Sequence, residues 1–97
     1  MATALSNDQI QEALQGLAGW SRDGDALQRE FKFGSFREAV SFIVRIAFAA
    51  EAANHHPELW NVYSTVRIRL NTHDAGGRIT QKDVDLAAEI SAISWVS

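Results

Sequence analysis

The 97-residue chain contains no cysteine and a single proline. Without cysteine the protein has no disulfide framework, no thiol nucleophile and no thiolate metal ligand, a composition that suits a reducing compartment. No stretch approaches the roughly 20 apolar residues that a membrane span needs. The opening MATALSNDQI also lacks the basic start and apolar run of a signal peptide. We therefore expect a cytoplasmic protein that does not enter a membrane.

Positive charge is also scarce. The chain has 9 Lys and Arg against 12 Asp and Glu, a formal net charge of −3, and its basic residues do not cluster. Because nucleic-acid surfaces usually gather Lys and Arg, we expect no nucleic-acid partner. The sequence also lacks a GxGxxG motif, a Walker motif and a GxSxG elbow, so the nucleotide-binding and hydrolase interpretations have no support.

The remaining composition is that of an ordinary globular protein, with 46% hydrophobic and 22% charged residues. At this length one hydrophobic core can form, and a second domain has no room. We therefore expect residues 1–97 to fold as a single domain.

Hydrophobic periodicity predicts the element order αββαββα. Apolar residues at helical spacing follow three capping boxes, which predicts helices at about residues 7–17, 36–53 and 81–95. Apolar and polar residues alternate within 19–33 and 59–72, each of which is predicted to form two strands joined by a short turn. These turns are expected at residues 23–25 and 64–65. The pattern indicates an α+β fold, a four-stranded antiparallel sheet with helices packed on one face.

The predicted helix at 36–53 is too apolar for one buried stripe. One stripe at helical spacing consists of Phe36, Ala39, Val40, Ile43, Ala47 and Ala50. Phe42, Val44 and Phe48 fall outside it. Since a second apolar surface usually contacts a partner subunit, this helix predicts association with another chain.

All three histidines lie at the ends of predicted elements, where functional groups tend to collect on a rigid scaffold. His55 and His56 directly precede Pro57, which ends the helix. The partial negative charge of a helix C terminus favours protonated imidazole and therefore a general acid. His73 follows the last strand, on its polar side by strand alternation, and begins a glycine-rich loop.

The same residues have structural interpretations. A single histidine near a helix end is more often a surface or capping residue than a catalyst, although two adjacent histidines before a proline are less usual. Asp83 completes the capping box of the last helix, and Glu51 is placed to form an ion pair with His55 one turn later. Trp60 and Tyr63 are expected to pack on the sheet, with a place in the site as the alternative.

A metal site is the weaker chemical interpretation. Glu51 and His55 have the spacing of a helical ligand pair, and His73 could supply a third ligand. That spacing occurs by chance in many proteins, and the HExxH motif is absent, so we expect no metal.

Together these residues resemble the signature of the pterin-4a-carbinolamine dehydratases. The matching residues are Glu51-x-x-x-His55-His56-Pro57, Trp60, the NVY of 61–63, Thr72-His73 and Asp83 shortly before Leu-Ala. The GW at Trp20, the phenylalanine spacing over 31–42 and the last helix also fit, so the resemblance covers nearly the whole chain.

The resemblance implies a four-stranded antiparallel sheet backed by helices, and assembly as a homodimer or homotetramer. It places the family's active-site histidines on His55, His56 and His73 and its motif acids on Glu51 and Asp83, with Trp60 as a further supporting residue. Its pterin-contacting stretches fall on Asn54-His55-His56 and on Asn71-Thr72-His73-Asp74. Some members carry Asp at the position of Asn54, so this chain lacks one charge beside the histidines. Some carry Glu at the position of Asp74, where this chain keeps the charge on a shorter side chain.

The implied reaction is the dehydration of a 4a-hydroxytetrahydropterin to a quinonoid dihydropterin. Aromatic amino-acid hydroxylases release the substrate, so such an enzyme is the implied partner in the pathway. An acid must protonate the departing oxygen and a base must remove the N5 proton, and imidazoles can do both without a metal or a cofactor. We expect His55 and His73 to form the acid–base pair, and His56 to bind and orient the ring.

A second function stays open beside the enzyme. Relatives of this fold also act as dimerisation partners of transcription regulators, which implies a non-catalytic interaction module as the alternative. That role would need only an exposed helix face, whereas dehydration needs the three histidines in one pocket.

Overall fold

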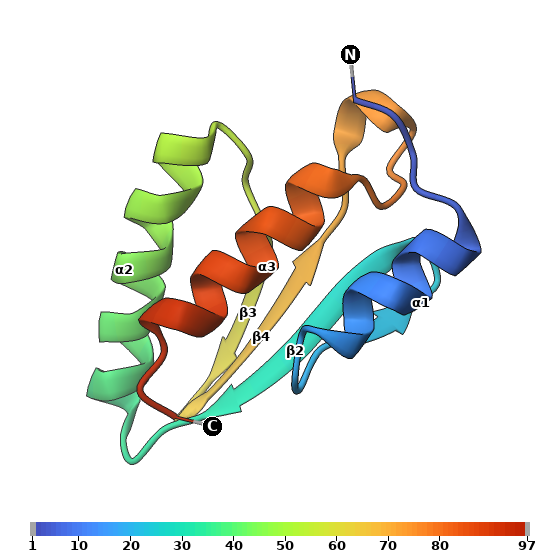
Figure 1. The fold of residues 1–97 in the computed structure, drawn as a ribbon. Helices are drawn as coiled ribbons and strands as arrows, with labels where there is room; N and C mark the ends of the chain where they lie inside the picture. The colour runs from blue at the N-terminus through green and yellow to red at the C-terminus, as the bar shows by residue number, and fades with distance from the viewer. Residues whose placement is uncertain (1, 97) are drawn as a thin grey trace.

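The structure, a computed structural model, describes residues 2–96 and has three helices packed on one face of a four-stranded antiparallel sheet (Figure 1). This confirms the predicted α+β fold and the order αββαββα. The elements are α1 (Asn7–Gln15), β1 (Ser21–Asp23), β2 (Ala26–Lys32), α2 (Phe36–Ala53), β3 (Glu58–Val62), β4 (Thr65–Leu70), the 3₁₀ turn η1 (His73–Ala75) and α3 (Gln81–Ile93).

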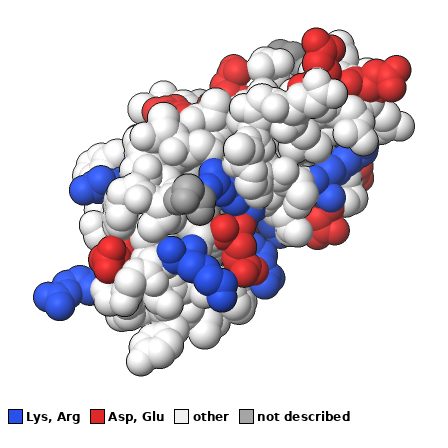
Figure 2. Space-filling view, turned by 60° about the horizontal axis from the view of Figure 1, so that its bottom comes forward, with Lys and Arg blue, Asp and Glu red and all other residues white. Residues whose placement is uncertain are grey.

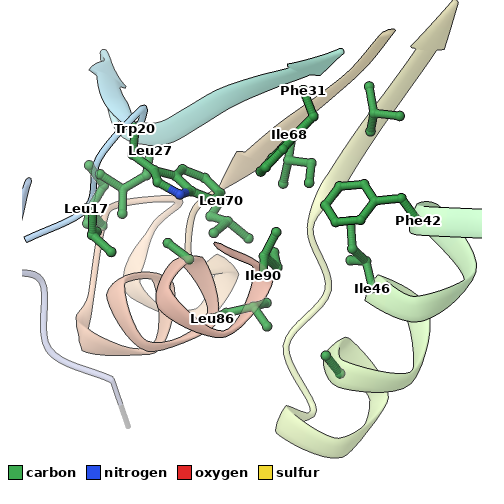
Figure 3. Packing of buried hydrophobic residues seen from close by; sticks show 14 of the residues in the cluster. Leu17, Trp20, Leu27, Phe31, Phe42, Ile46, Ile68, Leu70, Leu86 and Ile90 are labelled. Atoms are coloured by element: carbon green, nitrogen blue, oxygen red, sulfur yellow. The ribbon is translucent and has the colours of Figure 1, made fainter. Parts of the chain in front are cut away.

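The strands lie in the order β1-β2-β4-β3, so the two hairpins meet through β2 and β4 at the centre of the sheet. Strand alternation turns Val66, Ile68 and Leu70 toward the helices, where all three are fully buried. Arg67 and Arg69 point to the opposite face. Apolar residues of the sheet and of all three helices form one hydrophobic cluster (Figure 3).

Helix α2 has two apolar faces, as expected, but the predicted division between them is wrong. The buried face consists of Ala39, Phe42, Ile46, Ala49 and Ala50. The outward face consists of Phe36, Val40, Val44 and Phe48, which recur every four residues, and Phe48 is 75% exposed. Periodicity identifies two stripes, but the orientation of the helix on β3 and β4 decides which one is buried.

Several element ends differ from the prediction. Helix α1 stops at Gln15 because Gly16 caps it, and α3 stops at Ile93, two residues early. The turn between β3 and β4 lies at Tyr63 and Ser64, one residue before the predicted position, with Tyr63 at a φ of 57°. The Ser6 and Thr80 capping boxes are confirmed.

The third predicted capping box is only half formed. The Ser35 side chain accepts a hydrogen bond from the Glu38 amide, as a capping residue should. The Glu38 carboxylate accepts its bond from the Trp95 indole N–H at 3.1 Å rather than from the Ser35 backbone. Glu38 therefore ties the start of α2 to the C-terminal segment.

Candidate active site

One cleft lies where α2 ends, β4 runs into η1 and α3 begins. The end of α2 and the turn η1 are at the top of Figure 1. It has a volume of about 370 Å³. Its lining contains every residue expected to contact substrate, together with Lys82: Asn54, His55, His56, Asn71, Thr72, His73, Asp74 and Lys82. Segments distant in the sequence therefore bring all three histidines to one cavity.

A left-handed residue ends α2 and aims the histidine pair. Asn54 has a φ of 50° and a ψ of 43°, and its amide donates to the carbonyls of Ala50 and Glu51. The His55 amide donates to the Ala50 carbonyl at 3.0 Å. Both histidines therefore lie just beyond α2, whose predicted bounds, residues 36–53, are confirmed.

The His55 ring is held by a buried carboxylate. Its Nε2 lies 2.5 Å from Asp83 Oδ1, and both residues are buried, with Asp83 fully inaccessible. Because an ionised carboxylate only accepts, Nε2–H is the donor and this nitrogen carries the proton. Asp83 is thus both the predicted helix cap and the partner of His55.

The carboxylate of Asp83 is itself fixed from its other oxygen. Oδ2 accepts from the Thr72 hydroxyl at 2.9 Å and from the Thr80 amide at 2.8 Å. The two threonine hydroxyls lie 2.6 Å apart. This buried network sets the position of the carboxylate and hence the orientation of the imidazole.

The second ring nitrogen of His55 forms no hydrogen bond with the described residues. Nδ1 has no hydrogen-bond partner within residues 2–96. Within that range no side-chain nitrogen or oxygen is both buried and unpartnered, so Nδ1 must be accessible. With the proton on Nε2, the neutral tautomer of His55, which lines the cleft, has a free lone pair on Nδ1.

His56 occupies a different environment. Its Nε2 lies 2.7 Å from Glu51 Oε1, and both side chains are largely exposed. The predicted ion pair between Glu51 and His55 is therefore wrong. Glu51 pairs with His56, and His55 pairs with Asp83. Such an exposed pair contributes little to stability.

His73 approaches the cleft from the other side. It is the first residue of η1, is exposed, and follows Thr72, whose hydroxyl contacts Asp83. Gly76 and Gly77 both have positive φ and turn the chain back toward Arg78, which pairs with Thr72. The glycine-rich loop therefore fixes the position of His73 beside the His55 network.

Trp60 and Tyr63 lie away from the cleft. Trp60 pairs with Arg67 on the outer face of the sheet, where the guanidinium lies 4.4 Å from the ring centroid. Tyr63 is 80% exposed at the hairpin turn, so its predicted packing on the sheet is wrong. The sequence analysis did not identify Lys82 as part of the cleft or the Thr80 hydroxyl as part of the Asp83 network. The available signal was that both residues lie next to Asp83 in the sequence, at the start of the last helix.

Three surface and site properties bear on the other functions. Across the described residues, no three His, Cys, Asp or Glu side chains form a group able to hold a metal ion. Basic and acidic side chains are interspersed on the face shown in Figure 2. No helix within residues 2–96 has the length and apolar character needed to cross a bilayer.

The fold and cleft define a small α+β protein with a carboxylate-backed histidine beside two further imidazoles. The chain belongs to the pterin 4 alpha carbinolamine dehydratase family, whose model matches residues 3–93. Two relatives carry the name pterin-4-alpha-carbinolamine dehydratase provisionally. The protein of Opitutus terrae is 57% identical over 99% of both chains. That of Rhodopseudomonas palustris is 50% identical over 97% of this chain and 94% of its own.

Solved structures agree with the fold. The transcriptional coactivator/pterin dehydratase of Brucella melitensis has a TM-score of 0.88 and 36% identity, over 93% of this chain and 97% of its own. A pterin dehydratase-like protein identified as a RuBisCO assembly factor in the alpha-carboxysome has a TM-score of 0.64 and 23% identity, over 80% of this chain and 89% of its own. The second likeness extends to the fold alone.

Proposed function

We propose that this protein dehydrates a 4a-hydroxytetrahydropterin to the quinonoid dihydropterin by histidine acid–base catalysis. The family membership supports the substrate class. The observation that carries the mechanism is the buried Asp83–His55 pair, because it leaves Nδ1 unpartnered on a residue of the cleft that His56 and His73 also line.

The geometry suggests a role for each imidazole. The bond from C4a to its hydroxyl oxygen breaks, C4a and N5 form a double bond, and water leaves. His55 Nδ1 accepts the proton from N5, and Asp83 stabilises the imidazolium that results. His73 donates a proton to the departing oxygen. Each turnover leaves His55 protonated and His73 neutral, and proton exchange with water restores both starting states, so no further cofactor is needed.

The direct test is the rate of dehydration. The substrate is generated in place by an aromatic amino-acid hydroxylase, and the appearance of quinonoid dihydropterin is followed against the uncatalysed reaction. We expect saturable acceleration that is proportional to enzyme concentration. A rate equal to the uncatalysed background at every enzyme concentration would refute the proposal.

Replacing His56 by glutamine should affect binding more than turnover. His56 is exposed and held only by Glu51, so it can contact the pterin ring but has no buried carboxylate behind it. We expect KM to rise about threefold to tenfold, the loss of one hydrogen bond worth about 1 kcal/mol, with kcat nearly unchanged. Steady-state kinetics separate the two parameters, and a large fall in kcat would place His56 in the chemistry.

The outward face of α2 supports a second candidate function, protein interaction, which the Brucella relative's name as a coactivator also suggests. We propose that the occupant is a second copy of this chain. Two α2 helices packed antiparallel about Val44 would place Phe48 against Val40 of the partner. Arg37 lies seven residues before Val44, and Glu51 lies seven residues after it. In the antiparallel pair, Arg37 of one copy is therefore opposite Glu51 of the other, and the charges are complementary.

Replacing Phe48 by glutamate should break this association. Phe48 is the most exposed member of the outward face, and the change puts a charge at the centre of an apolar contact. We expect the mass measured by light scattering to fall to that of a monomer. Gln11→Glu adds the same charge on exposed α1 and should leave the mass unchanged. An unchanged mass for F48E would exclude this face from the interface.

A further inference from the structure

A second cavity, separate from the histidine cleft, lies beside Arg29. It has a volume of about 450 Å³ and is formed by the turn after α1, strand β2, the second half of α3 and the C-terminal segment. It shares no lining residue with the histidine cleft. Arg29 and Ser91 provide its polar side chains, and the other lining residues are glycine or apolar.

Arg29 is held rigidly at the cavity wall. Its guanidinium carbon lies 4.2 Å from the centroid of the Phe31 ring, and Nη1 donates to Ser91 Oγ at 3.1 Å. Gly19, at a φ of 86°, leaves room for the side chain, since a Cβ there would come within 2.7 Å of Arg29 Nε. The guanidinium is therefore fixed between a ring, a hydroxyl and a backbone turn.

Within residues 2–96 no acidic side chain pairs with the charge of Arg29. Within residues 2–96 the salt bridges involve Arg67, Arg69 and two histidines, and no carboxylate lies within 4.0 Å of Arg29. Partial burial lowers the pKa of Arg29, because desolvation penalises the charged form. The described residues offer this group an aromatic ring and a hydroxyl but no opposite charge.

The remaining N–H groups of Arg29 are available to a ligand. The guanidinium carries five donors, of which Ser91 accepts one. Nε and Nη2 form no hydrogen bond within residues 2–96, and since no side-chain nitrogen there is both buried and unpartnered, both are accessible. A planar guanidinium fork matches the two oxygens of a carboxylate, and its fixed position reduces the entropy lost on binding.

We propose that this cavity binds a small organic carboxylate with an apolar body. The carboxylate pairs with Arg29, and the body lies against Leu17, Ala18 and Val96. The volume falls in the range of small-molecule sites, roughly 300–1,000 Å³. Trp20 lies next to Leu17 and Leu27 (Figure 3), and its indole N–H donates to the same Ser91 oxygen at 2.8 Å. Trp20 therefore reports on a ligand that reaches Arg29.

The test is a titration of the full chain with benzoate at constant ionic strength, followed by ¹⁵N NMR of the Trp20 indole and the Arg29 side chain. We expect a saturable shift of both signals. Benzyl alcohol has the same ring without the charge, and we expect it to bind at least about tenfold more weakly, as the loss of a charge-assisted pair predicts. A linear shift, or equal affinity for the two compounds, would overturn the proposal.

Variants locate the site. Arg29→Met keeps the length of the side chain without its charge and should abolish saturation by benzoate. Arg22→Met removes an exposed arginine of β1 that does not line the cavity and should leave the saturation unchanged. Ala88→Phe fills the cavity while keeping Arg29, which secures the test if R29M does not fold, and should also weaken binding. Saturation by inorganic phosphate but not by benzoate would reject the carboxylate assignment.

Discussion

Replacing His55 by glutamine is expected to lower kcat for dehydration by about 10²- to 10⁴-fold, the usual contribution of one positioned acid–base group. The glutamine amide can still donate to Asp83, as Nε2 does now, but it offers no basic nitrogen to the cleft. The substitution thus removes the catalytic base but keeps the hydrogen bond to the buried carboxylate, so the melting temperature should change little.

The matched control is the adjacent residue. His56→Gln makes the same chemical change in a side chain that touches only an exposed acid, so the two kcat values should differ by at least about tenfold if His55 is the base. His73→Gln should also lower kcat, and the double variant with H55Q should lose less than the product of the two effects, because both residues serve one proton exchange. Equal kcat values for H55Q and H56Q would contradict the assigned role.

Replacing Asp83 by asparagine should lower kcat by a similar factor, about 10²- to 10⁴-fold, by changing the tautomer of His55. The asparagine carbonyl can keep the bonds from Thr72 and Thr80, which turns its NH₂ toward His55 Nε2. Nε2 must then accept, and the proton moves to Nδ1, the nitrogen that we propose as the base. The base is lost although the ring stays in place.

The change of tautomer in Asp83→Asn can be measured directly, and a purely structural role of Asp83 would not produce it. In ¹⁵N NMR the protonated nitrogen of neutral His55 should change from Nε2 to Nδ1. Asp85→Asn is the control, since Asp85 lies on the same helix, is exposed and bonds only to the Gln81 side chain. Asp83 would then be a positioning residue. An unchanged tautomer together with a reduced kcat would refute this explanation.

Much of the site could be predicted because its signals are local. The Thr80 capping box depends on residues three apart, and the alternation around Ile68 fixes one face of the sheet. The convergence of His73 on His55 and His56 came from family resemblance rather than from any pattern in the residues. Local periodicity cannot supply it, because it depends on how β4 and α3 are placed beside the end of α2.

The errors arise where tertiary structure overrides periodicity. Pairing Glu51 with His55 assumed that helical geometry continues to residue 55, but Asn54 adopts the left-handed conformation and turns both rings. Glu51 then meets His56, and His55 reaches a carboxylate 28 positions further along the chain. The buried stripe of α2 was misassigned for a related reason, since the sequence of a helix with two apolar faces does not say which face the sheet will cover.

The double duty of Asp83 links the local stability of a helix end to chemistry. The carboxylate that orients His55 also caps the first turn of α3, through the Thr80 amide. Transient fraying of that turn therefore releases the imidazole as well, and the fraction of competent molecules follows the opening free energy of a few backbone amides. Solutes that loosen helix termini without unfolding the core would reduce turnover long before spectroscopy registers denaturation.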